Sequence, residues 1–217
     1  MKKLLLGIAA VCLAGFTFAQ DAPLWMRHSV ISPDGTTIAF TYKGDIYTVP
    51  VAGGRAMQIT TNPAYDTAPV WSPDSKRIAF ASDRMGSLDV YIVAKDGGEP
   101  RRLTTHSGSE TPLAFTDAGH VLFSAGIMPS AEAVVFPSNG QFNQVYRVSV
   151  EGGRPTMISS MPMECISINK EGAMLYQDKK GYEDYWRKHH VSPIARDIWM
   201  YTPGKEPVSY THLTLPT

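Results

Sequence analysis

The densest group of residues that could do chemistry lies at positions 181–190, where the sequence reads GYEDYWRKHH. His189 and His190, together with a carboxylate, could bind a metal ion. However, adjacent side chains in an extended chain point in opposite directions, and no third ligand follows at a recognisable spacing. We therefore predict that this segment binds no metal and that the chain needs no cofactor.

The same segment can also be interpreted as a platform for a ligand or a peptide, because aromatic and arginine side chains dominate binding surfaces. The candidate residues of this substrate face are Tyr182, Tyr185, Trp186, Arg187, His189 and His190. The alternative is a loop that folds over the molecule and packs through its own aromatic side chains. The composition favours the loop, and the platform stays open as a second interpretation.

Covalent catalysis has no recognisable nucleophile in this sequence. The Gly-x-Ser-x-Gly motif, which marks the nucleophile of α/β-hydrolases, does not occur. Ser107 and Ser109 belong to a polar loop, and His106 is near them only in sequence. We assign no catalytic residue.

These segments lie within a repeated pattern, whose clearest copy spans residues 72–104. It begins with a Ser-Pro-Asp turn, in which proline presets φ and the aspartate can bond back to the backbone. Two apolar stretches at 78–80 and 90–93 have the composition of buried strands. Gly97-Gly98 can take positive φ in a tight turn, and Arg101-Arg102 suits an exposed outer strand.

Three further copies follow the same order of parts, upstream and downstream of the first. Repeats of about 40 to 45 residues, each with four short strands, are typical of β-propeller blades. We predict an all-β fold, an open and incomplete part of a larger propeller, whose last blade is itself incomplete. The predicted blades are residues 24–60, 68–104, 112–159 and 164–201.

Two insertions, near 125–143 and 178–196, interrupt the third and fourth copies between their second and third strands. Hairpins at this position emerge on one face of a propeller, where binding loops often gather. We therefore expect both insertions on the same face. In the second copy, Asp83 is expected to cap a turn and Arg84 to bridge to a neighbouring blade.

The first 19 residues read as a signal peptide. Lys2 and Lys3 precede an apolar run at 4–18, and Thr17-Phe18-Ala19 suits cleavage before Gln20. The run is too short for a membrane span, and Val11 argues against lipidation of Cys12. We predict a bacterial protein of the periplasm or the outside of the cell, without a membrane span after cleavage.

The charge balance argues against some classes of partner. Lys plus Arg and Asp plus Glu number 20 each, so no net field attracts nucleic acid. After cleavage only Cys165 remains, so no intramolecular disulfide can form. We expect Cys165 to be buried in the first strand of the fourth blade.

The repeated Ser-Pro-Asp, Ile-Ala-Phe, Asp-Ile/Val-Tyr and Gly-Gly elements resemble the propeller repeats of TolB and of tricorn-type proteases. Three further features are the predicted signal peptide, Trp25 at the start of the first blade, and the 181–190 segment. With these, residues 23–205 look most like bacterial tricorn-like serine peptidases of the Bacteroidales type. The resemblance implies a non-catalytic scaffold and substrate-access portion of a larger peptidase, whose partner is a peptide or protein substrate. The alternatives are a TolB-like protein-binding propeller and a propeller joined to an α/β-hydrolase.

Residues 206–217 match no outer strand of the earlier copies. Part of this tail alternates as a strand would, but from 208 it resembles translated sequencing adapter. We therefore interpret 20–205 as the propeller segment and 206–217 as a non-native tail. An open arc would also leave the inter-blade faces of its terminal blades uncovered, with residues such as Trp71, Phe80 and Trp199, and we expect self-association.

Overall fold

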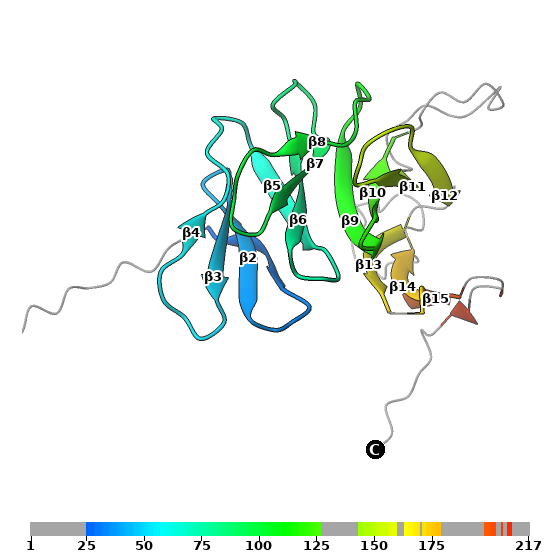
Figure 1. Ribbon diagram of the computed structural model, residues 1–217. Coiled ribbons are helices and arrows are strands. Elements are labelled where there is room, and N and C mark those ends of the chain that lie inside the picture. The colour runs from blue at the N-terminus through cyan, green and yellow to red at the C-terminus, as the bar shows by residue number, and fades with distance from the viewer. Residues whose placement is uncertain are drawn as a thin grey trace, which may run out of the picture.

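The computed structural model describes residues 25–126, 143–159, 163–169, 171–178, 198–202, 205 and 208–209. These residues form four antiparallel sheets of four strands each, arranged side by side as a fan, and contain no helix (Figure 1). Each sheet follows the order of its strands along the chain. The predicted all-β propeller architecture is confirmed.

We number the sheets blade 1 to blade 4, from the N-terminus. Their strands are β1 (Arg27–Ile31), β2 (Thr37–Tyr42), β3 (Asp45–Pro50) and β4 (Met57–Gln58) in blade 1; β5 (Asp66–Trp71), β6 (Arg77–Ser82), β7 (Asp89–Ala94) and β8 (Arg101–Arg102) in blade 2; β9 (Glu110–Asp117), β10 (His120–Ala125), β11 (Gln144–Ser149) and β12 (Thr156–Ser159) in blade 3; and β13 (Met163–Ile168), β14 (Met174–Asp178), β15 (Ile198–Tyr201) and β16 (Val208–Ser209) in blade 4.

The Ser-Pro-Asp sequence closes the turn between the first two strands of a blade. In blade 2, the Ser72 hydroxyl donates to Asp74 across 2.6 Å, and the Lys76 amide donates to the same carboxylate at 3.1 Å. The Ser75 amide completes the turn on the Ser72 carbonyl at 2.9 Å. The Ser72 hydroxyl also accepts from the Arg77 amide at 2.9 Å, so one serine joins both sides of the turn.

The core lies in the seams between blades, because every strand alternates its side chains between two faces. In blade 2, Phe80 stacks on Tyr91 with ring centroids 5.9 Å apart, and this face packs against Ala39 and Ile46 of blade 1. The opposite face, which carries Ala79, packs against the next blade. In β6 the large side chains Ile78 and Phe80 face blade 1 and the small Ala79 faces blade 3, while β7 presents large side chains to both seams.

The same aromatic pair recurs in the neighbouring blades. Phe123 and Tyr146 stack at 5.7 Å in blade 3, inside its seam with blade 2. The blade 1 pair, Phe40 and Tyr47, stacks at 5.8 Å on the face turned away from blade 2. The fold thus builds the same contact surface at least three times.

Two expectations about the terminal blades are wrong. Trp71 and Phe80 do not lie on an uncovered face, since both are buried in the seam between blades 1 and 2. Trp199 packs, partly buried, against the cluster between blades 3 and 4. Blade 4 also has an outer strand, because Met200 pairs with Val208 and Trp199 with Ser209. Such a strand needs only two residues of extended backbone, as in β4 and β8, too few to give a sequence signal.

The inner strands are less regular than the others. Each of β1, β5 and β13 shifts register through a bulge, and one residue there takes a left-handed φ: His28 at 50°, Ala68 at 51° and Cys165 at 52°. Cys165 therefore lies in β13 as expected, but it is exposed rather than buried. The bulge interrupts the alternation that would have turned its side chain into the core.

Candidate functional site

All six predicted substrate-face residues, Tyr182, Tyr185, Trp186, Arg187, His189 and His190, lie outside the described residues. The flanking strands are described: β14 ends at Asp178 and β15 begins at Ile198. The other insertion likewise joins β10, ending at Ala125, to β11, beginning at Gln144. Both insertions thus connect second to third strands, as predicted, while the common direction of their tips stays a prediction.

The equivalent hairpins of blades 1 and 2 lie at the end of the fan that also carries the connections between blades, which we call the loop end (Figure 1). The Asp66 amide donates to the carbonyl of Gly44, in the first hairpin, at 2.7 Å. The Glu110 amide donates to the carbonyl of Leu88, in the second, also at 2.7 Å. Each connection is therefore fixed to the hairpin of the preceding blade.

A threonine after the outer strand binds the start of the third strand at the loop end in both blade 1 and blade 2. In blade 1, Thr60 donates its hydroxyl to Asp45 at 3.2 Å and accepts from the Ile46 amide at 3.0 Å. In blade 2, the Thr104 hydroxyl accepts from the Val90 amide at 2.9 Å. These contacts tie the end of each outer strand to the start of the third strand. Burial raises the pKa of Asp45, and the hydrogen bond from Thr60 partly opposes this.

Arg84 stabilises the blade 2 hairpin by an ion pair within its own blade. Its guanidinium lies 2.7 Å from the carboxylate of Asp66, which is fully buried at the start of β5. It also donates to Ser82 at 3.0 Å and lies over the Phe80 and Tyr91 rings. The expected bridge from Arg84 to a neighbouring blade is therefore wrong. The predicted blade 2 began at residue 68 and so left Asp66 outside, whereas Asp66 is the first residue of the inner strand.

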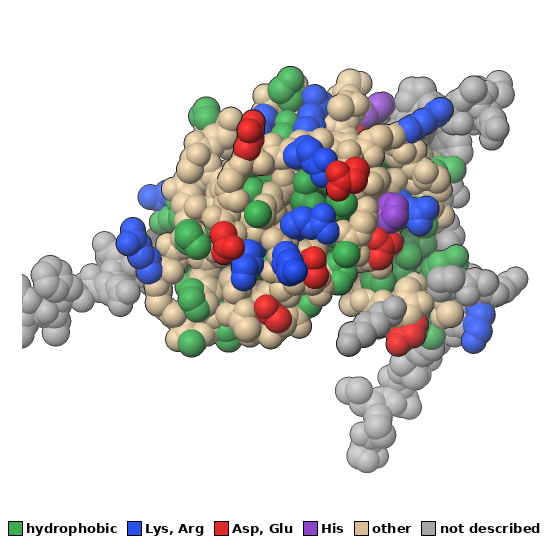
Figure 2. All heavy atoms as spheres, in the orientation of Figure 1, with side chains coloured by type: hydrophobic (Ala, Val, Ile, Leu, Met, Phe, Trp, Pro, Cys, Tyr) green, Lys and Arg blue, Asp and Glu red, His purple; other side chains and the backbone are tan. Residues whose placement is uncertain are grey.

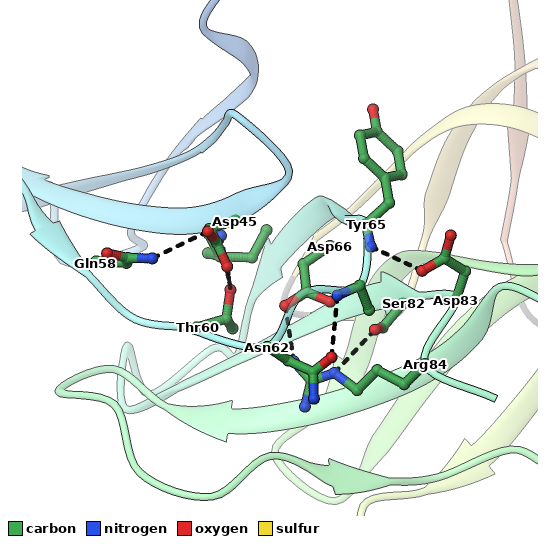
Figure 3. A network of polar contacts seen from close by, with 11 residues as sticks. Asp45, Gln58, Thr60, Asn62, Tyr65, Asp66, Ser82, Asp83 and Arg84 are labelled. Carbon is green, nitrogen blue, oxygen red and sulfur yellow. Dashed lines mark hydrogen bonds and ion pairs between the residues drawn. The ribbon is translucent and has the colours of Figure 1, made fainter.

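Asp83 makes the contact to the neighbouring connection instead. Its carboxylate accepts a 2.7 Å hydrogen bond from the amide of Tyr65, in the segment that joins blades 1 and 2 (Figure 3). The ring of Tyr65 points away from this polar network and is 42% exposed. Met85, at the tip of the same hairpin, is 65% exposed. The loop end thus offers apolar contact groups on a rigid polar base.

The hydrogen bonds of two histidines do not involve a nucleophile. His106 accepts from the Gly108 amide through Nδ1 at 3.0 Å and so shapes the connection between blades 2 and 3. His120 pairs with Asp117 at 3.0 Å in an exposed turn at the opposite end of blade 3. Across the described ranges, no group of three or more metal-binding side chains lies together. The hydrogen bonds at the loop end are therefore suited to holding the connections between blades in place and to presenting side chains for contact.

Two properties of the wider surface complete the description. On the face in view, Figure 2 shows basic and acidic side chains interspersed, in keeping with 20 of each in the chain. Within the part of the chain that the structure describes, no helix is long and apolar enough to cross a membrane.

Sequence comparison decides which family carries this site. The model of the tricorn protease N-terminal beta propeller domain matches residues 23–213. The chain belongs to this family. A Streptomyces coelicolor protein named tricorn protease homolog 1 is 25% identical to this chain over 180 residues. The match covers 82% of this chain but 16% of the relative. The chain therefore spans less than a fifth of that relative.

Solved structures agree on the fold of the tricorn-type propeller. TolB from Agrobacterium tumefaciens superposes with a TM-score of 0.66 at 16% identity, covering 88% of this chain and 64% of that one. The tricorn protease gives a TM-score of 0.60 at 13% identity, covering 85% of this chain and 22% of that one. The resemblance to TolB and tricorn-type repeats is confirmed, and the Bacteroidales type stays a prediction.

Sequence reasoning missed two residues of the loop end, Asp66 and Glu110. Both look like members of polar connections, yet they begin inner strands and are fully buried. A signal was present, because the step from Asp66 to Glu110 is the same as the steps from Asp45 to Asp89 and from Thr60 to Thr104. A polar residue that recurs in register with structural partners belongs to the repeat itself.

Proposed function

We propose that the tricorn-type propeller is a non-catalytic scaffold that shapes substrate access in a larger serine peptidase. The observation that carries this proposal is the family match over residues 23–213, together with a relative named as a protease homolog in which the matched part is a small fraction. The loop end supports it physically, because in blades 1 and 2 a hydrogen-bonded base holds exposed apolar side chains, and the two long insertions occupy the equivalent hairpins of blades 3 and 4.

The insertion at 178–196 would contact the peptide or protein substrate through Tyr182, Tyr185, Trp186, Arg187, His189 and His190. The test shortens this insertion to a tight turn in the full peptidase and compares turnover of a short peptide with that of a long peptide. Access control predicts that kcat/KM changes for the long peptide, while the short peptide and the fold of the blades are unaffected.

The matched control is Asp96→Ala, in the exposed turn between β7 and β8, away from the loop end. If both substrates respond to shortening as they do to the control, the insertion has no role in access, and only the scaffold role survives. Alanine variants of Tyr185 and Trp186 then distinguish contact with substrate from packing of the loop on its own blade.

A TolB-like propeller that binds proteins without catalysis is the second candidate. The TM-score of 0.66 to TolB from Agrobacterium tumefaciens favours it. In either case we propose export through residues 1–19, removal of this signal, and a place in the periplasm or outside the cell. Sequencing the source locus past residue 205 separates the two functions, because a peptidase domain downstream supports the first and an early stop the second.

That locus also tests the proposed boundaries, with the propeller segment at 20–205 and the tail at 206–217 as a non-native addition. Recovery of the same codons after position 205, followed by a genuine stop, contradicts the non-native tail. Mass spectrometry of the exported protein tests signal removal, with Gln20 expected as the first residue.

A further inference from the structure

The two seams of blade 2 contain equivalent pairs of acidic residues, but the negative charges of the two pairs are balanced in different ways. Asp45 and Asp66 interact electrostatically across the seam between blades 1 and 2, and Asp89 and Glu110 do so across the seam between blades 2 and 3. In the first seam, Asp66 forms an ion pair with Arg84 of its own hairpin at 2.7 Å. In blade 3 the equivalent segment between the second and third strands, residues 126–143, contains no Lys, Arg or His.

Glu110 is fully buried, and among the described residues no donor lies within normal hydrogen-bonding distance of either carboxylate oxygen, although the Thr104 hydroxyl is near enough to lower its pKa. Asp89 is equally buried: its Oδ1 pairs with Arg102 at 2.9 Å, and its Oδ2 has no donor among the described residues. Burying an ionised carboxylate without a donor or a counter-ion is strongly destabilising.

Each seam holds two carboxylates and one arginine. In the first seam the arginine pairs with the fully buried Asp66, and the partly exposed Asp45 accepts hydrogen bonds from Thr60 and Gln58. In the second seam the arginine pairs with Asp89 and leaves the fully buried Glu110 without a cation.

The titratable and charged groups that the structure brings to Glu110 are Asp89 from β7, Arg102 from β8 and His106 from the connection. On β10, the residue paired with Glu110 is Ala125. His106 Nδ1 lies 4.0 Å from Glu110 Oε1, but it accepts the Gly108 amide proton at 3.0 Å and so carries no proton of its own. Arg102 is already engaged by Asp89.

We propose that Glu110 and Asp89 share one proton as a buried carboxylic acid–carboxylate pair. The shared proton keeps the seam between blades 2 and 3 closed, and loss of this proton loosens the seam. Two adjacent carboxyl groups in an apolar site cannot both ionise cheaply, so a proton takes the place that Arg84 fills in the first seam. The proton sits between Glu110 and the free Oδ2 of Asp89, while Arg102 holds Oδ1.

The electrostatics of the site agree with this arrangement. Burial, the largest cause, and the Asp89 carboxylate together raise the pKa of Glu110 to about 7, against the opposing effects of the Thr104 hydroxyl and Arg102. A folded pKa above the unfolded one means that the stabilisation is complete at low pH. It is lost as pH rises from the ordinary glutamate value through about 7, and no further change is expected above that.

Hydrogen exchange on the full 217-residue chain tests the proposal with an internal control. The Glu110 amide bonds to the Leu88 carbonyl at 2.7 Å, and the Asp66 amide bonds to that of Gly44 at the same distance. Between about pH 5 and pH 7.5, protection of the Glu110 amide, corrected for intrinsic exchange, should fall by on the order of 10- to 100-fold. Protection of the Asp66 amide should fall less, because Asp66 is paired with Arg84 and the only described acid with a raised pKa in this seam, Asp45, is partly exposed.

Glu110→Gln keeps the shape of the side chain and can donate to Asp89, so its seam should show no such pH dependence. Asp66→Asn is the matched variant at the other seam and should leave the pH response at Glu110 intact. Equal pH responses at both seams of the wild type, a flat response at Glu110, or a response that persists in Glu110→Gln would overturn the proposal. The wild-type comparison decides the matter even if a variant fails to fold.

Discussion

The indole of Trp71 donates a hydrogen bond to the backbone carbonyl of Val30, 3.2 Å away in the neighbouring blade. Trp71 ends the inner strand of blade 2, and Val30 lies in that of blade 1, so one side chain connects two sheets that share no backbone ladder. The Asp34 amide, which donates to Ser75 at 3.1 Å, makes a second link of this kind. Polar links of this type fix the angle between blades that apolar packing alone leaves adjustable.

Trp71→Phe should destabilise the chain by about 1 to 2 kcal/mol, because it leaves the Val30 carbonyl without its donor and removes part of a buried ring. Urea unfolding followed by circular dichroism measures this loss. Met85→Ala, at an exposed hairpin tip, is the control and should change the unfolding free energy by less than about 0.5 kcal/mol. Equal effects of the two variants would show that the link contributes nothing.

Arg84→Met should be among the most destabilising single changes in blade 2. It keeps the length of the side chain but leaves the fully buried carboxylate of Asp66 without its counter-ion, a loss of about 3 to 5 kcal/mol for a buried pair. The control is Glu151→Gln, which breaks the exposed Arg101–Glu151 pair and should leave the unfolding free energy almost unchanged, because solvent screens that pair. A smaller loss for Arg84→Met than for Glu151→Gln would contradict the importance of the buried pair.

Ser72→Ala should destabilise the chain at neutral pH, and the loss should shrink in acid, where the contribution of Asp74 is absent from both proteins. The hydrogen bond from Ser72 holds the pKa of Asp74 below its usual range, so this contribution to stability is present above the unfolded pKa and disappears as pH falls through the folded one. The variant should bring the pKa of Asp74 closer to that of a free aspartate. A carboxyl titration by NMR measures it, and an unchanged pKa would show that another group sets the value.

The 217-residue chain should self-associate in isolation. Phe40 and Tyr47 form on blade 1 the stacked pair that a neighbouring blade covers in blades 2 and 3; here Phe40 is buried but Tyr47 is partly exposed, and Leu175 and Ile198 of blade 4 are about half exposed. A face of one copy can therefore meet the complementary face of another. Sedimentation velocity should detect oligomers that Tyr47→Lys reduces, whereas Met85→Lys should not. A monodisperse wild-type monomer would contradict this prediction.

The sequence by itself determined the number and order of the blades. Each Ser-Pro-Asp turn is closed by contacts within a few residues, such as Ser72 with Asp74, and strand alternation acts over neighbouring positions. Features that depend on such local rules recur with the repeat and can be recognised in it. The same locality made the positions of both long insertions, between second and third strands, predictable.

Only the tertiary structure decided which polar residues are buried and what they meet. Asp66 and Glu110 are both acidic residues at the start of an inner strand, yet one faces Arg84 and the other faces Asp89. Cys165 is exposed because a bulge in β13 breaks its alternation, and β16 forms because two residues reach the edge of β15. These outcomes depend on contacts between segments far apart in the chain, which local composition does not encode.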